Sequence, residues 1–426
     1  MSKLDELIRE LCPNGVEYYA LNTVCNVYDG THQTPKYTDS GIKFASVENI
    51  ANPYATKKFI SISDYEKYKI RPQRNDLLMT RIGSVGVCAV LESDEPLAYY
   101  VSLALLRPNN NVLSSRYLKY AIESLHCRKE LRKRTLVNAV PIKINVGDIG
   151  KITIPVPPLE VQREIVRILD NFTELTAELT AELTARKKQY GFYRDKLLTF
   201  DVLGEETSKV AWRTLGDIIV SLNTGLNPRQ FFRLNTDDAS NYYVTIREIQ
   251  NGTIVFSDKT DRINDEALRL CNNRSNLEVG DVLFSGTGTI GETAVISEPP
   301  MNWNIKEGVY AIKPQKDVLD SRYLMYILRT DALKTAIAKK VAGGTVKSIP
   351  MAEMRKLKVP VPSLAVQERL VNVLDNFDAI CSDLNIGLPA EIEARQKQYE
   401  YYRDKLLTFA ESGSTILTDR QTDRQG

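Results

Sequence analysis

The sequence IPVPPLEVQREIVRILDNF at residues 154–172 returns as VPVPSLAVQERLVNVLDNF at residues 359–377. Eleven of these nineteen positions are identical, at an offset of 205 residues. The octapeptide YRDKLLTF at 193–200 then recurs unchanged at 402–409, where the offset has grown to 209. Because internal repeats decide the organisation of a fold before any local signal does, we expect a tandem repeat.

The stretches between these blocks match only at scattered positions. NDLLMTRIGSVGVCAV (75–90) aligns with GDVLFSGTGTIGETAV (280–295), and SRYLKY (115–120) aligns with SRYLMY (321–326). The chain therefore has the order module, helix, module, helix. Near-identical connectors between divergent modules favour two different targets that are held at a fixed separation.

The connector blocks have the pattern of long helices. Each opens on a proline-rich segment, which is extended because a proline keeps the preceding residue out of the α region. From Leu159 to Phe200 apolar residues then recur mostly every three or four positions, which is the spacing of a coiled-coil seam. Gly387 and Pro389 are expected to break or kink the second block. Two ordinary core helices are the alternative, but length and similarity favour two long helices packed antiparallel.

The modules have the pattern of mixed domains. Short β-branched or aromatic runs such as VCAVLE, YYVTIREI and DVLF lie between turn residues, and each module has one expected helix, SRYLKYAIES or SRYLMYILRT. The predicted class is α+β: two mixed α/β modules separated by two long antiparallel coiled-coil-like helices, in a tandem pseudo-repeat. The predicted boundaries are 1–152 for the first module, 153–204 for the central helix, 205–357 for the second module, 358–410 for the distal helix and 411–426 for a disordered tail.

Composition excludes several classes of protein. A chain of 426 residues exceeds one ordinary core. It contains no apolar run long enough to cross a membrane, and MSKLDELIREL is an amphipathic helix start rather than a signal peptide. We therefore expect a cytoplasmic protein with six reduced cysteines. Only two histidines, His32 and His126, argue against a zinc site, and a net charge of +2 requires that any nucleic-acid surface be local.

Catalytic motifs are weak. Gly286, Gly288 and Gly291 in FSGTGTIG fit G-x-G-x-x-G, and Phe284 completes an F-x-G-x-G that resembles a methyltransferase cofactor loop. Such a loop leads from a strand into a helix, whereas ETAVISEPP follows here, so a glycine hairpin is the favoured interpretation. Residues 52–54, Asn-Pro-Tyr, lack the second proline of the amino-methyltransferase N-P-P-Y motif. Catalysis by this chain is not expected.

Signals for DNA binding are local. The basic run 128–134 is either a solvated helix face or a source of phosphate contacts. The loops THQTPK (31–36) and NTGLNPRQ (223–230) occupy equivalent places in the two modules. They are either plain turns or base readers, since Gln and Asn bind adenine and Arg and Lys bind guanine. The candidate base readers are Gln33, Lys36, Arg81, Ser84, Lys143, Asn227, Arg229, Gln230, Arg247, Thr287 and Lys347, and the candidate phosphate contacts are Arg132, Lys133 and Arg134.

Several motifs together give a family resemblance. They are the P-V-P-P-L-x-x-Q opening with its L-D-N-F close, the R-x-K-Q-Y…Y-R-D-K-L-L-T-F end, and the D-x-L-x-x-x-x-G-S/T-x-G of each module. From Leu4 to Phe409 the chain resembles the DNA-specificity subunit of type I restriction–modification enzymes. The run TELTAELTAELT (173–184) is similar to the type IC subclass.

The resemblance implies a function and partners. Each module would be a target recognition domain that reads one half of a bipartite double-stranded DNA site with a nonspecific spacer. The helices would dock two modification (methyltransferase) subunits, and restriction (translocase/nuclease) subunits would join. S-adenosylmethionine, ATP and Mg would belong to those partners and none to this non-catalytic chain. The alternatives are a methyltransferase that uses FSGTGTIG, or a coiled-coil scaffold that binds no DNA. The candidate docking residues are Gln162, Arg163, Tyr193, Arg194, Gln367, Arg369, Tyr402 and Arg403.

Overall fold

The computed structural model describes residues 2–200, 210–343, 346–382 and 387–409. The predicted disordered tail lies outside these residues. The chain forms two compact units, Met1–Glu178 with Glu393–Gly426, and Leu179–Ile392. The first unit contains the first module and the second unit contains the second module.

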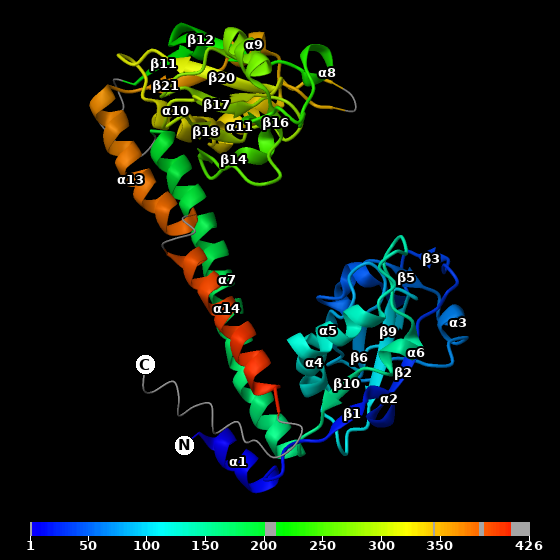
Figure 1. Ribbon diagram of the computed structural model, residues 1–426. Coiled ribbons are helices and arrows are strands. Elements are labelled where there is room, and N and C mark those ends of the chain that lie inside the picture. The colour runs from blue at the N-terminus through cyan, green and yellow to red at the C-terminus, as the bar shows by residue number, and fades with distance from the viewer. Residues whose placement is uncertain (1, 201–209, 344–345, 383–386, 410–426) are drawn as a thin grey trace. The chain divides into compact units, whose positions relative to one another are not determined.

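The first unit has two four-stranded sheets (Figure 1). One is antiparallel with the order β2 (Cys25–Asp29), β9 (Leu103–Pro108), β6 (Leu77–Thr80), β7 (Cys88–Val90). The other has the order β3 (Tyr37–Thr38), β5 (Phe59–Ile60), β4 (Ile42–Ala45), β8 (Leu97–Tyr99), with β4 and β8 parallel. A short pair, β1 (Tyr18–Ala20) with β10 (Thr153–Pro155), leads to the connector.

Strand β6 has a continuous apolar sequence without polar alternation, because both of its faces are buried. Leu77 and Met79 pack into one core cluster, with Tyr117 and Val161. Leu78 packs into another, with Leu97. A strand that is buried on both faces reads as a continuous apolar run, and β6 is such a strand.

The second unit repeats this architecture. Its antiparallel sheet has the order β12 (Ile219–Thr224), β20 (Val309–Pro314), β17 (Val282–Ser285), β18 (Thr293–Val295). Its mixed sheet has the order β16 (Arg262–Ile263), β13 (Asn241–Val244), β19 (Trp303–Ile305), again with one parallel pair. The remaining pairs are β11 (Ala211–Thr214) with β21 (Lys358–Val361) and β14 (Ile249–Gln250) with β15 (Thr253–Ile254). The matching strand orders confirm the duplication.

The prediction of one helix per module was wrong. The expected helices are α4 (Ser115–Glu123) and α10 (Ser321–Leu328). Each is followed at once by another, α5 (Leu125–Arg134) or α11 (Asp331–Ala338), because Ser124 and Thr330 cap a new helix with their side-chain oxygens. The other helices are α1 (Lys3–Leu11), α2 (Leu21–Val24), α3 (Ile62–Tyr65), α6 (Val146–Ile149), α8 (Pro228–Phe231), α9 (Asp265–Ser275) and α12 (Met351–Arg355).

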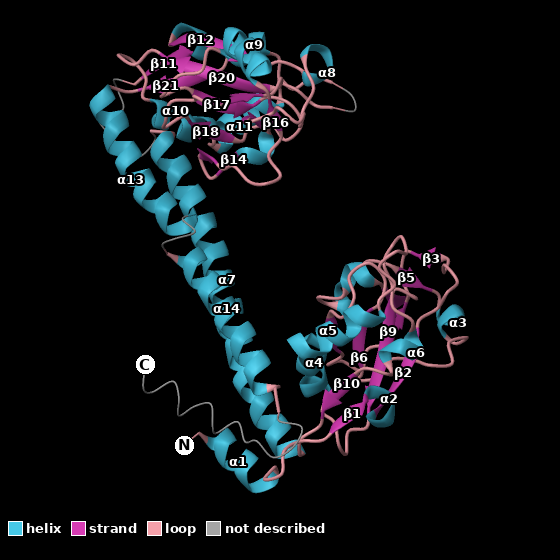
Figure 2. Cartoon of the chain, viewed as in Figure 1, coloured by secondary structure: helices cyan, strands magenta, loops and turns pink. Residues whose placement is uncertain are grey.

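The connectors are long helices (Figure 2). The central one is α7 (Leu159–Leu198), a single helix of 40 residues. The distal one consists of α13 (Leu364–Ser382) and α14 (Leu388–Leu406). Pro389 lies in the first turn of α14, where a proline removes no intrahelical hydrogen bond.

The pairing of these helices is antiparallel. In the first unit Phe172 of α7 stacks on Tyr402 of α14, with ring centroids 5.4 Å apart. In the second unit Tyr190 of α7 stacks on Phe377 of α13 at 6.4 Å. Later residues of α7 thus meet earlier residues of the distal connector, and the predicted fold class is confirmed.

Candidate nucleic-acid interface

A buried glutamine fixes each module to its connector helix. The side-chain oxygen of Gln162 accepts a hydrogen bond from Ser114 N at 2.9 Å, and its NH2 group donates to Val112 O and Pro157 O, both at 2.7 Å. In the second unit Gln367 makes the same three bonds, to Asp320 N at 2.8 Å and to Val318 O and Pro362 O at 2.9 Å. Both glutamines are fully buried. A buried amide needs all its partners, so these two predicted docking residues are engaged inside the chain.

An aspartate eight residues after each glutamine, about two helical turns further along, makes a second repeated contact between module and connector. Asp170 accepts hydrogen bonds from Tyr120 Oη at 2.6 Å and from Arg116 at 2.7 Å. In the second unit Asp375 takes Tyr326 Oη at 2.6 Å and Arg322 at 2.7 Å. Burial, followed by the Asp375 carboxylate, raises the pKa of Tyr326, so this phenol stays protonated and remains a donor.

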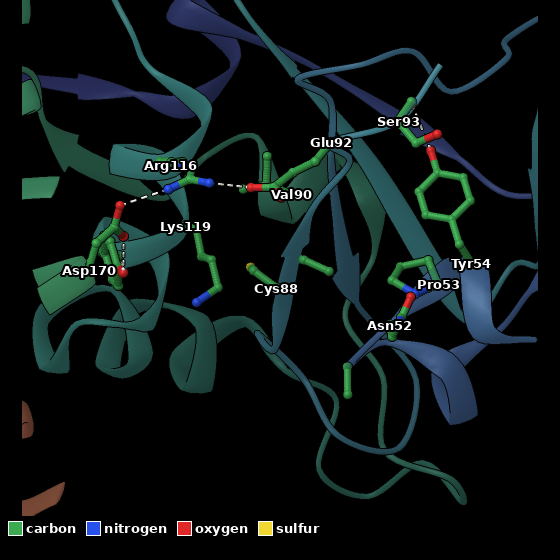
Figure 3. Close-up of a pocket in the computed structure, with 13 residues that line it drawn as sticks. Asn52, Pro53, Tyr54, Cys88, Val90, Glu92, Ser93, Arg116, Lys119 and Asp170 are labelled. Carbon is green, nitrogen blue, oxygen red and sulfur yellow. Dashed lines mark hydrogen bonds and ion pairs between the residues drawn. The ribbon is translucent and has the colours of Figure 1, made fainter. Parts of the chain in front are cut away.

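A cavity of about 560 Å3 lies beside the first of these clusters (Figure 3). Asn52, Pro53 and Tyr54 line it, together with Arg116 and Asp170. The Tyr54 hydroxyl donates to Ser93 O at 3.0 Å, and Arg116 also pairs with Glu92. The charged Arg116 is thus already paired within the wall, and the Asn-Pro-Tyr segment forms a short 3-10 turn at Pro53–Ala55.

The repeated octapeptide anchors the far end of each connector. Asp404 accepts a hydrogen bond from Leu125 N, the first residue of α5, at 2.9 Å, and Asp195 accepts one from Asp331 N, the first residue of α11, at 2.8 Å. Arg403 and Arg194 bond the neighbouring aspartates. Leu407 and Phe409 fill the core of the first unit, and Leu198 and Phe200 fill that of the second.

The remaining docking candidates are exposed. Arg163 and Arg369 lie on the outer faces of α7 and α13. Tyr193 packs edge-on against Phe192 at 5.5 Å, and Tyr402 packs in the same way against Tyr401 at 5.4 Å. Phe192 and Tyr401 are 63% and 58% exposed. No sequence signal singled out these two residues, although each stands immediately before YRDKLLTF.

Three loops of the first module, which we call the first loop cluster, are residues 31–36, 81–86 and 136–143; Gly83 N donates to Ile142 O at 2.8 Å, and Val101 N, next to the Arg81 side chain, donates to Thr31 O at 3.0 Å. Arg81 joins them. It pairs with Asp29 at the end of β2 and donates to Val101 O at 3.0 Å and to Ile144 O at 3.2 Å. Because Arg81 is only 6% exposed, this predicted base reader instead holds the loops in place.

The other candidates of the first module are available at the surface. Gly83 N donates to Ile142 O at 2.8 Å, and residue 82 bridges to residue 143. This brings Ser84 and Lys143, both exposed, into neighbouring loops. Gln33 and Lys36 are exposed on the third loop.

The second loop cluster consists of residues 223–230, 286–291 and 342–348, of which 344–345 lie outside the described residues. Gly288 N donates to Lys347 O at 2.9 Å, and Thr287 bridges to Ser348. Glu307 N, beside the 286–291 hairpin, donates to Leu226 O at 3.2 Å. The structure thus gathers the candidates Thr287, Lys347, Asn227, Arg229 and Gln230.

Two of the second module's candidates have local partners. The side chain of Asn227 accepts a hydrogen bond from Arg229 N at 3.0 Å and so caps α8. Arg247 lies instead on the 3-10 turn Ile246–Glu248 and pairs with Asp261 at 2.7 Å.

The FSGTGTIG segment is a hairpin. It connects β17 to β18, which are antiparallel. Gly288 has a φ of 78°, as Gly83 has 83° in the equivalent hairpin, and glycine adopts this left-handed backbone without steric cost. The glycine-hairpin interpretation is confirmed, because a strand and not a helix follows the turn.

The basic run lies on helix α5. Arg132 and Lys133 are exposed, and Arg134 is partly buried. Lys133 and Arg134 both pair with Glu130, at 2.9 Å and 2.6 Å. Hydrogen bonds from these two cations lower the pKa of Glu130, so part of the positive charge is compensated within the helix.

The described residues contain neither a metal-binding cluster nor a membrane-spanning helix. No group of three His, Cys, Asp or Glu side chains among them could hold a metal ion. None of the helices that the structure describes is long and apolar enough to cross a membrane.

Tandem α/β modules on long antiparallel helices define a class of duplicated two-domain proteins. Within this class, residues 13–186 and 208–394 match the family described as "Type I restriction modification DNA specificity domain". The chain belongs to this family.

Two individual relatives are consistent with this family match. The chain is 36% identical over 270 residues to the EcoR124I/EcoR124II type I restriction enzyme specificity subunit of Escherichia coli, which covers 61% of this chain and 63% of the relative. It is 35% identical over 280 residues to a putative type I restriction enzyme specificity subunit of Haemophilus influenzae, covering 63% and 66%. The match thus spans slightly less than two thirds of these relatives.

A solved structure supports the fold. It comes from work on complex assembly and conformational transition of the type I R-M system, and it aligns over 92% of this chain and 97% of its own length. The TM-score is 0.59 at 16% identity, so this likeness concerns the fold alone.

Proposed function

We propose that this chain is the non-catalytic DNA-recognition subunit of a type I restriction–modification complex. Each module reads one half of a bipartite target, and a nonspecific spacer separates the halves. The observation that carries this proposal is the pair of loop clusters. The two clusters occupy equivalent places on a repeated scaffold. Within each cluster one equivalent backbone bond joins two loops, from residue 83 to 142 in the first and from 288 to 347 in the second. The side chains of the two clusters differ.

The complex around the chain supplies the chemistry. S-adenosylmethionine binds to modification subunits, and ATP and Mg to restriction subunits, all in the cytoplasm. The TAEL run at 173–184 supports the further proposal that the system is of the type IC subclass. The hairpin geometry of residues 286–291 speaks against the rival methyltransferase function.

Methylome sequencing tests this function. A host that gains this chain together with its modification subunits should acquire methylated adenine in a bipartite motif. Exchange of residues 1–152 for the first module of a homologue should change one half of that motif. No new methylation, or a change in both halves, would contradict two independent readers.

The exposed aromatic pairs support two copies of the modification subunit. Phe192 with Tyr193, and Tyr401 with Tyr402, present the same surface once in each unit, with Lys196 and Lys405 over the outer rings at 5.9 Å and 5.4 Å. Aromatic residues are enriched where protein interfaces form. We therefore assign one modification subunit to each pair.

Native mass spectrometry tests the stoichiometry. The wild-type complex should contain two modification subunits. Phe192→Ser and Tyr401→Ser should each favour loss of one, and the double variant should favour loss of both. Lys129→Ser, at an exposed residue of α5, is the control. A single modification subunit on the wild-type chain would contradict the assignment.

A further inference from the structure

An apolar loop is exposed in the first loop cluster. Leu136, Val137, Val140 and Ile142 are 45%, 61%, 100% and 38% exposed. A single exposed aliphatic side chain is ordinary, but a group of them in one loop marks a contact site. The loop is therefore a candidate for direct contact with a ligand.

Backbone hydrogen bonds hold the base of this loop. Leu136 N donates to Lys143 O at 2.7 Å, and Ala139 N donates to Leu136 O at 3.2 Å. Ile144 N donates to Arg81 O at 3.0 Å, which ties the loop to the hairpin at 81–86. A loop that is already ordered loses less entropy on binding, so its apolar tip is presented in a defined position.

Cations flank the apolar tip. Lys143 stands exposed at one end of the loop, and Arg132 and Lys133 stand exposed on the last turn of α5, which ends just before the other end. In DNA the phosphates border the groove and the base edges lie between them. Apolar side chains between exposed cations therefore fit a DNA groove.

The second module has a loop in the same place with different side chains. Ala342 and Ser348 exchange backbone bonds of 2.8 Å and 2.9 Å, and residue 287 bridges to residue 348, as residue 82 bridges to residue 143. Counted from these bridges, Gly343 and Lys347 stand where the first loop has Val137 and Ile142, and Val346 lies beside Lys347. A constant frame with changed side chains is expected of the element that decides what each module reads.

We propose that Val137, Val140 and Ile142 contact thymine methyl groups in the major groove of the half-site that the first module reads. The C5-methyl group is the one apolar feature that a base pair displays there, and small aliphatic side chains contact it. This inference rests on the proposed function, and it names the chemical group that the first module selects.

Deoxyuridine substitution tests the contact, because uracil differs from thymine only by the missing methyl group. The complex of the full chain with its modification subunits is titrated with duplexes that contain the target found by methylome sequencing. Module exchange identifies the half-site of the first module. Replacing its thymines one at a time by deoxyuridine should weaken binding on the order of tenfold at one position or more.

A double-mutant cycle connects the methyl group to the loop. In the variant Val137→Ser/Val140→Ser the thymine duplex should bind as weakly as the uracil duplex does to wild type, and uracil should cause no further loss. Val346→Ser in the second module is the matched control and should retain the full uracil effect in the first half-site. Circular dichroism and thermal unfolding should match wild type, since these side chains are exposed.

Each other outcome overturns the inference. A half-site without thymine, an unchanged affinity for uracil, or an additive cycle excludes the methyl contact. If the serine variant loses its modification subunits but keeps the uracil effect, the loop binds protein. If wild type binds no specific duplex, the proposed function itself fails, and this result is distinct from all the others.

Discussion

The carboxylate of Asp404, at the end of α14, accepts a hydrogen bond at 2.9 Å from the backbone N–H of Leu125, the first residue of α5. These residues are 279 positions apart, yet the bond acts as a helix cap, since the first N–H groups of a helix have no intrahelical acceptor. A negative charge at that position also stabilises the helix, because it interacts favourably with the positive end of the helix dipole.

Asp404→Ala should therefore lower the free energy of unfolding of α5 by about 1 kcal/mol, which is the usual cost of a lost cap. Hydrogen exchange of the amides at 125–134 should accelerate, while those of α11 stay unchanged. Asp195→Ala is the matched variant, because Asp195 caps α11 at 2.8 Å, and it should show the reverse pattern. Equal acceleration of both helices by either variant would refute two separate caps.

Gln162→Ala should destabilise the first unit by roughly 2–4 kcal/mol, because Ser114 N, Val112 O and Pro157 O would lose a buried partner. Thermal unfolding should show a lower Tm for this unit. Arg163→Ala, at the exposed neighbouring position, is the control and should stay within about 0.5 kcal/mol of wild type. Similar losses from both variants would show that the buried amide has no special role.

The stability of the second unit should fall as pH rises through about 6. Burial raises the pKa of Asp281 from its usual 3.8 to about 6. The folded state therefore binds the proton more tightly than the unfolded state. This contribution is fully present below about pH 4 and is lost as pH rises through about 6.

Asp281→Asn should flatten this part of the profile, because an amide does not titrate and can still accept from Glu278 N, as Asp281 does at 2.9 Å. The measurement is the free energy of unfolding between pH 4 and 7. Parallel profiles for wild type and variant would assign the pH dependence to other groups.

Insertion of one more TAEL unit into 173–184 should lengthen the nonspecific spacer of the target by one base pair. The run lies inside the continuous helix α7. Four residues advance a helix by about 6 Å and rotate it by about 40°. One base pair of B-DNA rotates by roughly 35°, so the new phase nearly matches one step along the duplex.

A single inserted alanine is the control for this prediction. It rotates the seam at Leu175, Leu179 and Leu183 by about 100°, so the complex should lose activity. Methylome sequencing reads both results. An active complex with four extra residues and an unchanged spacer would contradict the role of α7 in setting the spacing.

The sequence predicts those parts of the fold that depend on neighbours along the chain. The helical connectors follow from apolar spacing, and the hairpin at 286–291 follows from glycine followed by a strand. Helix α9 was missed although its signal was present, since Asn264 with Asp265 and Glu266 forms a good helix start.

Roles that depend on distant partners could not be predicted. Gln162 looked like a surface residue because its three partners come from another loop and from the proline segment. Arg81 looked like a base reader because Asp29, which engages it, lies 52 residues away. The local sequence around a polar residue does not show whether the residue is buried. Only the structure separates the buried from the exposed residues among the docking candidates and among the base-reading candidates.

The octapeptide YRDKLLTF fills both cores with identical residues, through Leu198 and Phe200 in the second unit and Leu407 and Phe409 in the first. The same octapeptide therefore completes the core of both units, and each module provides a matching apolar site for it. The loops that would read the target in the proposed function do not include the octapeptide, so they can diverge without changing these core contacts. A chain built in this way can acquire a new target by exchange of a whole module, while the octapeptide contacts that hold the module in place stay the same.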